Sequence, residues 1–187
     1  MVVAAKLKIS LAEFLELPET KPASEYIDGK IYQKPMPQGK YSKLKDELLS
    51  GINRVGKPGK LAHAFPELRC TFGGRSIVPD IAVFEWSRIP IDEDGEIANP
   101  IEVAPDWIIA ILSPDQSPNP VIKKIIFSIQ HGTKLGWFAD PRDKSVIAFA
   151  PNQMPEFISG TDILPVLSVL RDWQLSATAL FNMLKIN

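Results

Sequence analysis

One carboxylate interrupts an otherwise apolar segment of the chain. Asp80 stands in the middle of residues 78–84, where β-branched and aromatic residues predict a strand buried on both faces. An unpaired carboxylate inside a core costs several kcal/mol, so Asp80 needs a cationic partner, a bound metal or a water-filled cleft. A structural explanation is a buried aspartate that caps a turn or pairs with an arginine such as Arg69 or Arg75. A functional explanation is a metal or phosphate site.

A lysine further along the chain could complete such a site. Lys124 lies on a helix expected to run from Asn119-Pro120 to Gly132, directly after the apolar segment 107–112. Hydrolysis of a phosphodiester with a hard metal ion requires oxygen ligands for the metal and a cation near the attacking water or the scissile phosphate. Lys124 could supply that positive charge, whereas Lys123 is expected to point to solvent.

The elements that would position these residues form a mixed sheet. Segments 107–112 and 135–139 read as buried strands joined by the helix that carries Lys124, which predicts a right-handed parallel crossover. Within the first strand, Ile108, Ala110 and Leu112 share a face. The other elements expected are a helix over 11–17 after the N-cap Ser10, a hairpin over 26–32 with an Asp28-Gly29 turn, a helix over 39–52, two strands within 61–72, a strand over 145–149, a short strand near 157–158 and a helix over 176–184. The fold class expected is α/β (α+β), with a mixed central sheet flanked by helices.

Composition excludes several classes of protein. The length of 187 residues predicts one domain over 1–187, and the net charge of −1 gives no global signal for nucleic acid. A single cysteine, Cys70, excludes an internal disulfide framework and fits a cytoplasmic location. No apolar stretch approaches the roughly 20 residues that span a bilayer, and we expect no secretion signal and no membrane partner.

Five short motifs, taken in order, resemble the Uma-type family of restriction-endonuclease-like proteins, which looks like a branch of the PD-(D/E)XK nuclease superfamily. They are Glu25-Tyr26-Ile27-Asp28-Gly29, the segment 78–83, Ile111-Leu112-Ser113-Pro114, Gly132 and Gly136-Trp137-Phe138-Ala139-Asp140-Pro141. The resemblance runs from about Leu11 to the C-terminus. It implies a restriction-endonuclease-like fold, Mg²⁺ or Mn²⁺ as cofactor, DNA as substrate or ligand, and a homodimer.

The resemblance also assigns roles to individual residues. Asp80 matches the metal-binding aspartate, Lys124 the catalytic lysine that this family carries on the helix, and Glu25 the accessory acid of the first motif. The main-chain carbonyl of Ile111 would remain available to a metal whatever its side chain.

Two site positions depart from the family pattern. The second metal ligand, a glutamate, falls at position 110, where this chain has Ala110, and a frequent histidine falls at Tyr41. A methyl group cannot coordinate a cation. Asp106 lies about 13 Å from position 110 along an extended strand and is too far to replace the glutamate. Asp115, across a Ser-Pro turn, is a replacement that no pattern supports.

Three functions follow from this sequence. The first is a divalent-metal-dependent endonuclease impaired by Ala110. The second is a catalytically inactive relative that acts through nucleic-acid binding or oligomeric contacts. The third is an interaction protein unrelated to nucleic acid, which salt-dependent binding to a duplex would exclude.

Overall fold

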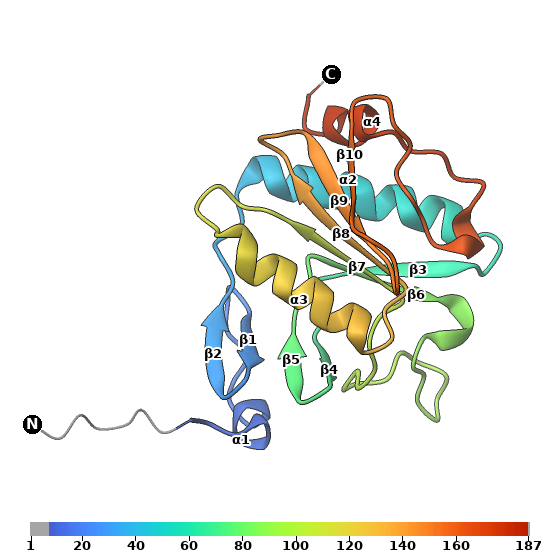
Figure 1. Ribbon diagram of the computed structural model, residues 1–187. Coiled ribbons are helices and arrows are strands. Elements are labelled where there is room, and N and C mark those ends of the chain that lie inside the picture. The colour runs from blue at the N-terminus through green and yellow to red at the C-terminus, as the bar shows by residue number, and fades with distance from the viewer. Residues whose placement is uncertain (1–7, 187) are drawn as a thin grey trace, which may run out of the picture.

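Two β-sheets organise the chain, of which a computed structural model describes residues 8–186 (Figure 1). The larger sheet has six strands in the order β10-β9-β8-β7-β6-β3, and the smaller has four in the order β2-β1-β5-β4. The strands are β1 (Ser24–Ile27), β2 (Lys30–Gln33), β3 (Ala62–Pro66), β4 (Cys70–Phe72), β5 (Arg75–Ile77), β6 (Ile81–Glu85), β7 (Trp107–Ile111), β8 (Leu135–Asp140), β9 (Ser145–Phe149) and β10 (Glu156–Ser159). The helices are α1 (Leu11–Leu15), α2 (Gly39–Gly56), α3 (Pro118–Gln130) and α4 (Ala177–Asn182), with short 3-10 turns at Trp86–Arg88 and Ser168–Leu170.

The larger sheet is mixed, as the sequence predicts. β7 and β8 are parallel and are connected through α3, whereas the remaining strand pairs of this sheet are antiparallel. The predicted parallel crossover and the predicted α+β class with a mixed central sheet are therefore confirmed.

Helices cover both faces of the larger sheet. In Figure 1, α3 lies across one face, and α2 and α4 lie behind the other. On the α3 face, Val121 and Ile125 pack against Ile108 and Phe138. The opposite face holds the larger apolar cluster, in which residues of α2 and α4 surround the fully buried Trp107 and Trp137. Alternating residues of β7 thus contribute to two cores, and Ala110 lies on the α3 face together with Ile108 and Leu112, as predicted.

Asp80 does not lie inside a strand, which corrects the prediction of a continuous strand over 78–84. β5 ends at Ile77 and β6 begins at Ile81, so residues 78–80 form a link between the smaller and the larger sheet. Pro79 explains the interruption, because it has no N–H with which to continue a ladder. Asp80 therefore stands at the junction of the two sheets.

Helix boundaries also differ from expectation. α2 continues to Gly56, four residues beyond the predicted end at 52. α3 begins at Pro118 after the N-cap Ser117, rather than at Pro120 after the predicted N-cap Asn119. Pro118 is itself well suited to the first helical position, because its missing N–H would have no partner there. Gly132 follows α3 with φ +107°, which agrees with the predicted helix end.

Two further features bear on function. Among the described residues, no helix is long and apolar enough to cross a membrane. Cys70 is a free, buried thiol, and burial raises its pKa to about 12, so it is an unreactive small core residue rather than a nucleophile.

The contact between β8 and α3 predicts a stability effect at Gly136. A Cβ at this position would lie inside van der Waals distance of the Ile125 side chain, which is fully buried. We expect Gly136→Ala to lower the free energy of unfolding by about 1–3 kcal/mol, measured by urea denaturation. Gly39→Ala is the matched control, because a Cβ at Gly39 meets no atom within 4 Å. Equal stability of the two variants would contradict this packing.

Candidate active site

Asp80 is held between the two sheets by a backbone donor and a lysine. β6 pairs with β7 so that Ile81 faces Ile109, and continuation of this antiparallel register places Asp80 opposite Ala110. The Asp80 carboxylate accepts the N–H of Ile111 at 2.7 Å through Oδ2 and the ammonium of Lys34 at 2.8 Å through Oδ1. Asp80 therefore has the cationic partner that its place in an apolar segment requires, and that partner is Lys34.

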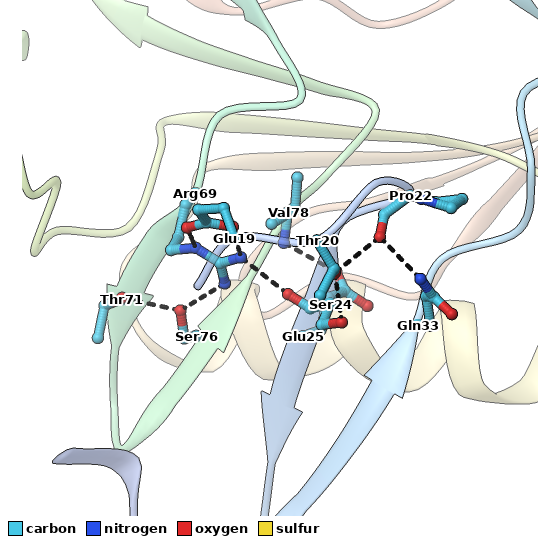
Figure 2. A network of polar contacts seen from close by, with 10 residues as sticks. All are labelled: Glu19, Thr20, Pro22, Ser24, Glu25, Gln33, Arg69, Thr71, Ser76 and Val78. Atoms are coloured by element: carbon cyan, nitrogen blue, oxygen red, sulfur yellow. Dashed lines mark hydrogen bonds and ion pairs between the residues drawn. The ribbon is translucent and has the colours of Figure 1, made fainter. Parts of the chain in front are cut away.

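Glu25 approaches the same junction from β1. Its side chain is buried, with the residue only 3% exposed. Oε1 accepts the N–H of Val78 at 2.8 Å, and Oε2 pairs with the ammonium of Lys124 at 2.6 Å. Figure 2 shows the Glu25 side chain reaching from its strand to Val78. Both acids therefore fix the link 78–80. Glu25 binds Val78, and Asp80, the last residue of the link, binds Ile111.

An arginine fixes the strand that carries Glu25. Arg69 pairs with Glu19 through two bonds of 2.7 Å, and it also donates to the carbonyl of Ser24 and to Ser76, which accepts a bond from Thr71 (Figure 2). These contacts join β1 to β4 and β5 immediately beside Glu25. Glu25 therefore lies in a part of the smaller sheet where several side-chain hydrogen bonds connect the strands.

A small cavity lies among the charged side chains. Its volume of about 30 Å³ suits a water molecule or a small ion but not a nucleotide, and its lining includes Glu25, Asp80, Ala110 and Lys124. An adjoining pocket of about 380 Å³ opens along the hairpin and α3, and Lys34 and Lys124 line both spaces. The larger pocket is within the size range of small-molecule sites.

The structure brings together the residues that the sequence singles out. Glu25, Asp80, Lys124, Ala110 and Ile111 all line the small cavity. The N–H of Ile111 donates to Asp80. The metal-binding role of the Ile111 carbonyl stays a prediction, and so do the catalytic roles of the other residues.

The flanking positions also agree with expectation. Tyr41 lies in a neighbouring depression that also includes Lys34 and Asp80, so it borders the site. Lys123 is exposed, as predicted, on the rim of the larger pocket.

The partner of Asp80 is not one of the arginines considered from the sequence. Arg69 pairs with Glu19 and Arg75 with Asp28, which leaves Lys34 as the partner. The sequence shows that Asp80 needs a counter-charge but contains no pattern that marks Lys34. It follows the exposed strand β2 and precedes Pro35, a position typical of a solvated lysine.

Neither Asp106 nor Asp115 places a carboxylate near position 110. Asp106 is fully buried and pairs with Arg88 and Lys134, at the opposite end of β7 from Ile111. The pKa of Lys134 is raised chiefly by its bond to Glu85, with Asp106 adding to the effect. Asp115 is exposed and lines none of the pockets around Asp80.

The two histidines have structural surroundings. His63 packs against Phe65, and its pKa is lowered by burial and by Lys57, whereas His131 packs against Phe127 and is hydrogen-bonded to the Phe127 carbonyl. Neither histidine lines the cavity around Asp80.

The residues present do not fit a divalent cation. Magnesium requires several oxygen ligands with a net negative charge. Here each oxygen of the two carboxylates already accepts a hydrogen bond, two from ammonium groups, and the third expected ligand is a methyl group. Within residues 8–186, no group of three or more His, Cys, Asp or Glu side chains could hold a metal ion.

Comparison with known proteins identifies the family. The model of the Uma2 family, described as "Putative restriction endonuclease", matches residues 11–178. The chain belongs to the Uma2 family. A crystal structure of a putative nuclease belonging to DUF820, from Anabaena variabilis ATCC 29413, is 54% identical and superposes with a TM-score of 0.93 over 95% of this chain and 99% of the other. A comparison with curated proteins finds no match.

Proposed function

We propose that this Uma2 protein binds the backbone of DNA at the cavity beside Asp80 and that its divalent-metal-dependent hydrolysis of phosphodiester bonds is impaired. Membership of a family described as restriction endonucleases supports the class of substrate. Glu25 and Asp80 are proposed as the acids of the site, and Lys124 as the cation beside the scissile phosphate. Families of this fold generally use divalent metals, and we propose that binding of Mg²⁺ or Mn²⁺ at this site requires a carboxylate at position 110.

Ala110 carries the argument for impairment. It lies opposite Asp80 in the β6–β7 register and lines the same cavity as Lys124. Side chains directly opposite each other on neighbouring strands have Cβ atoms about 5 Å apart, so a glutamate at 110 would place a third carboxylate beside Asp80. Loss of a direct metal ligand has a larger effect than the ~10–100-fold typical of outer partners.

Charge balance favours the second candidate, a catalytically inactive relative that binds nucleic acid or forms oligomeric contacts. The two acids around the cavity are each paired with a lysine, at 2.8 Å and 2.6 Å. A neutral, internally paired site can persist without a metal, because no buried charge is left uncompensated. A homodimer and a cytoplasmic location remain predictions from the sequence.

A plasmid-nicking assay with Mg²⁺ and with Mn²⁺ separates the two candidates. We expect Ala110→Glu to raise the nicking rate above that of the native protein by more than the ~10–100-fold of an outer metal partner. The added activity should disappear in the Ala110→Glu/Asp80→Ala double variant, because both carboxylates are required.

The matched control is Ala110→Gln, which introduces a side chain of the same size without a carboxylate and should not gain activity. Native cleavage that is abolished by Asp80→Ala alone would mean that the site is complete without residue 110. Absence of cleavage by Ala110→Glu would leave nucleic-acid binding as the function and would remove the support for the site assignment.

Binding to DNA should depend on salt but not on metal. In the presence of EDTA, we expect the logarithm of the association constant for a duplex to fall linearly with the logarithm of the salt concentration. The reason is that lysines which neutralise phosphates release counterions from the DNA. Lys123→Met, on the rim of the larger pocket, should reduce the magnitude of this slope by about 1. Fluorescence anisotropy over a salt series measures both effects.

Lys185→Met is the control for this experiment, because Lys185 is exposed and lines none of the pockets around Asp80. It comes three residues after α4, a helix that lies on the side of the sheet away from α3 (Figure 1). Equal slopes for the two variants would place DNA elsewhere on the protein. No binding even at low salt would exclude both proposed functions and would favour an interaction protein unrelated to nucleic acid.

A further inference from the structure

Lys34 occupies a position in this site that the function above does not explain. The residue directly follows β2, and its ammonium donates to the carbonyl of Val78 and to Oδ1 of Asp80, both at 2.8 Å. The side chain is only 10% exposed, although β2 itself is exposed throughout. An ordinary surface lysine keeps its ammonium in water, whereas this one extends from an exposed strand into the junction of the two sheets.

The atoms that hold Lys34 are the kind that hold a metal. A carboxylate oxygen and a main-chain carbonyl oxygen are the ligands that hard divalent cations prefer. Lys34 contacts one of each, and both come from the link 78–80 at the centre of the site. An ammonium and a divalent cation therefore compete for the same side of Asp80.

The charge of the cavity favours the ammonium. Glu25 and Asp80 contribute two negative charges, and Lys34 and Lys124 contribute two positive charges, so the four side chains sum to zero. A glutamate at position 110 would make the sum negative, but the chain has Ala110 there. A divalent ion that entered beside Lys34 would meet an ammonium instead of a ligand.

We propose that the Lys34 ammonium takes the place of a divalent cation at Asp80 and excludes metal from the native cavity. This inference rests on the proposed function only in treating the Asp80 cavity as the site. It adds that loss of the carboxylate at position 110 is matched by a cation from the chain itself, which keeps Asp80 paired. One of the three N–H bonds of the ammonium is not used by Val78 or Asp80 and is free to meet water or a phosphate oxygen.

Titration with Mn²⁺ in the absence of DNA tests the proposal, with free Mn²⁺ measured by its electron paramagnetic resonance signal. Lys34→Met keeps the aliphatic stem and removes the charge, which leaves Asp80 and the Val78 carbonyl open. We expect this variant to bind Mn²⁺ at least about tenfold more tightly than the native protein, because removal of the positive charge in contact with Asp80 leaves the carboxylate unpaired and removes the repulsion of the metal. The gain should be lost in Lys34→Met/Asp80→Ala.

Lys185→Met is the matched control, because it removes an exposed lysine that lines none of the pockets around Asp80 and should leave the native affinity unchanged. Two results would overturn the proposal. One is a native protein that binds one Mn²⁺ as tightly as Lys34→Met and loses it in Asp80→Ala. The other is a folded Lys34→Met variant that gains no affinity.

A measurement on the native chain decides the question if Lys34→Met fails to fold. A hydrogen-bonded, poorly exposed ammonium exchanges its protons slowly, so the Nζ of Lys34 should give a resolved cross-peak in a spectrum that correlates lysine nitrogens with their protons, assigned with Lys34→Arg. We expect the peak to persist unchanged when Mg²⁺ is added. Its shift or loss on addition of Mg²⁺ would overturn the proposal.

The outcome of these experiments does not depend on the outcome of the DNA-binding experiments. Metal titration and the lysine spectrum contain no nucleic acid, so a protein that binds no DNA can still exclude metal through Lys34. Conversely, a native protein that binds Mn²⁺ at Asp80 would contradict the role of Lys34 while leaving DNA binding intact.

Discussion

The ion pair between Asp80 and Lys34 lies where the two sheets of this protein meet. Asp80 follows the proline that interrupts the chain between β5 and β6, and its carboxylate also accepts the N–H of Ile111 from β7. Lys34 arrives from the end of the β1–β2 hairpin, so the pair joins the smaller sheet to the larger one. Glu25 and Lys124 repeat the arrangement across the cavity, between β1 and α3. Both pairs also hold the 78–80 link, because Oε1 of Glu25 accepts the N–H of Val78 and the Lys34 ammonium donates to the Val78 carbonyl.

Under the proposed function, the same arrangement lets this chain keep its fold without a carboxylate at position 110. A third carboxylate at position 110 would make the net charge of the cavity negative, whereas with Ala110 the charges of the lining side chains balance. An uncompensated acid at such a junction would be destabilising, since breaking one partner of a buried pair leaves a charge out of water. Lys34 supplies the compensation on one side and Lys124 on the other. Binding of nucleic-acid backbone by lysines requires no metal, so the proposed DNA binding does not need a carboxylate at position 110.

Much of the fold and of the candidate site could be predicted from the sequence, and the features that could not have physical reasons. The Asp28-Gly29 turn, with φ of +52° and +84°, the parallel crossover through α3 and the shared face of Ile108 and Ala110 follow from local signals and periodicity. The motifs also indicated that Glu25, Asp80 and Lys124 belong to one site, although they are far apart along the chain. The interruption at Pro79 was readable in principle, because proline cannot continue a central ladder. The role of Lys34 could not be predicted, because an ion pair between residues 46 positions apart in the chain produces no local sequence pattern.

Anomalous diffraction from crystals of the native protein soaked in Mn²⁺ would test the central claim most directly, because it locates the metal and the Lys34 side chain in one experiment. The account predicts no manganese peak between Asp80 and Glu25, with the Lys34 ammonium still hydrogen-bonded to Asp80. A manganese peak coordinated by Asp80, with Lys34 displaced towards solvent, would contradict it.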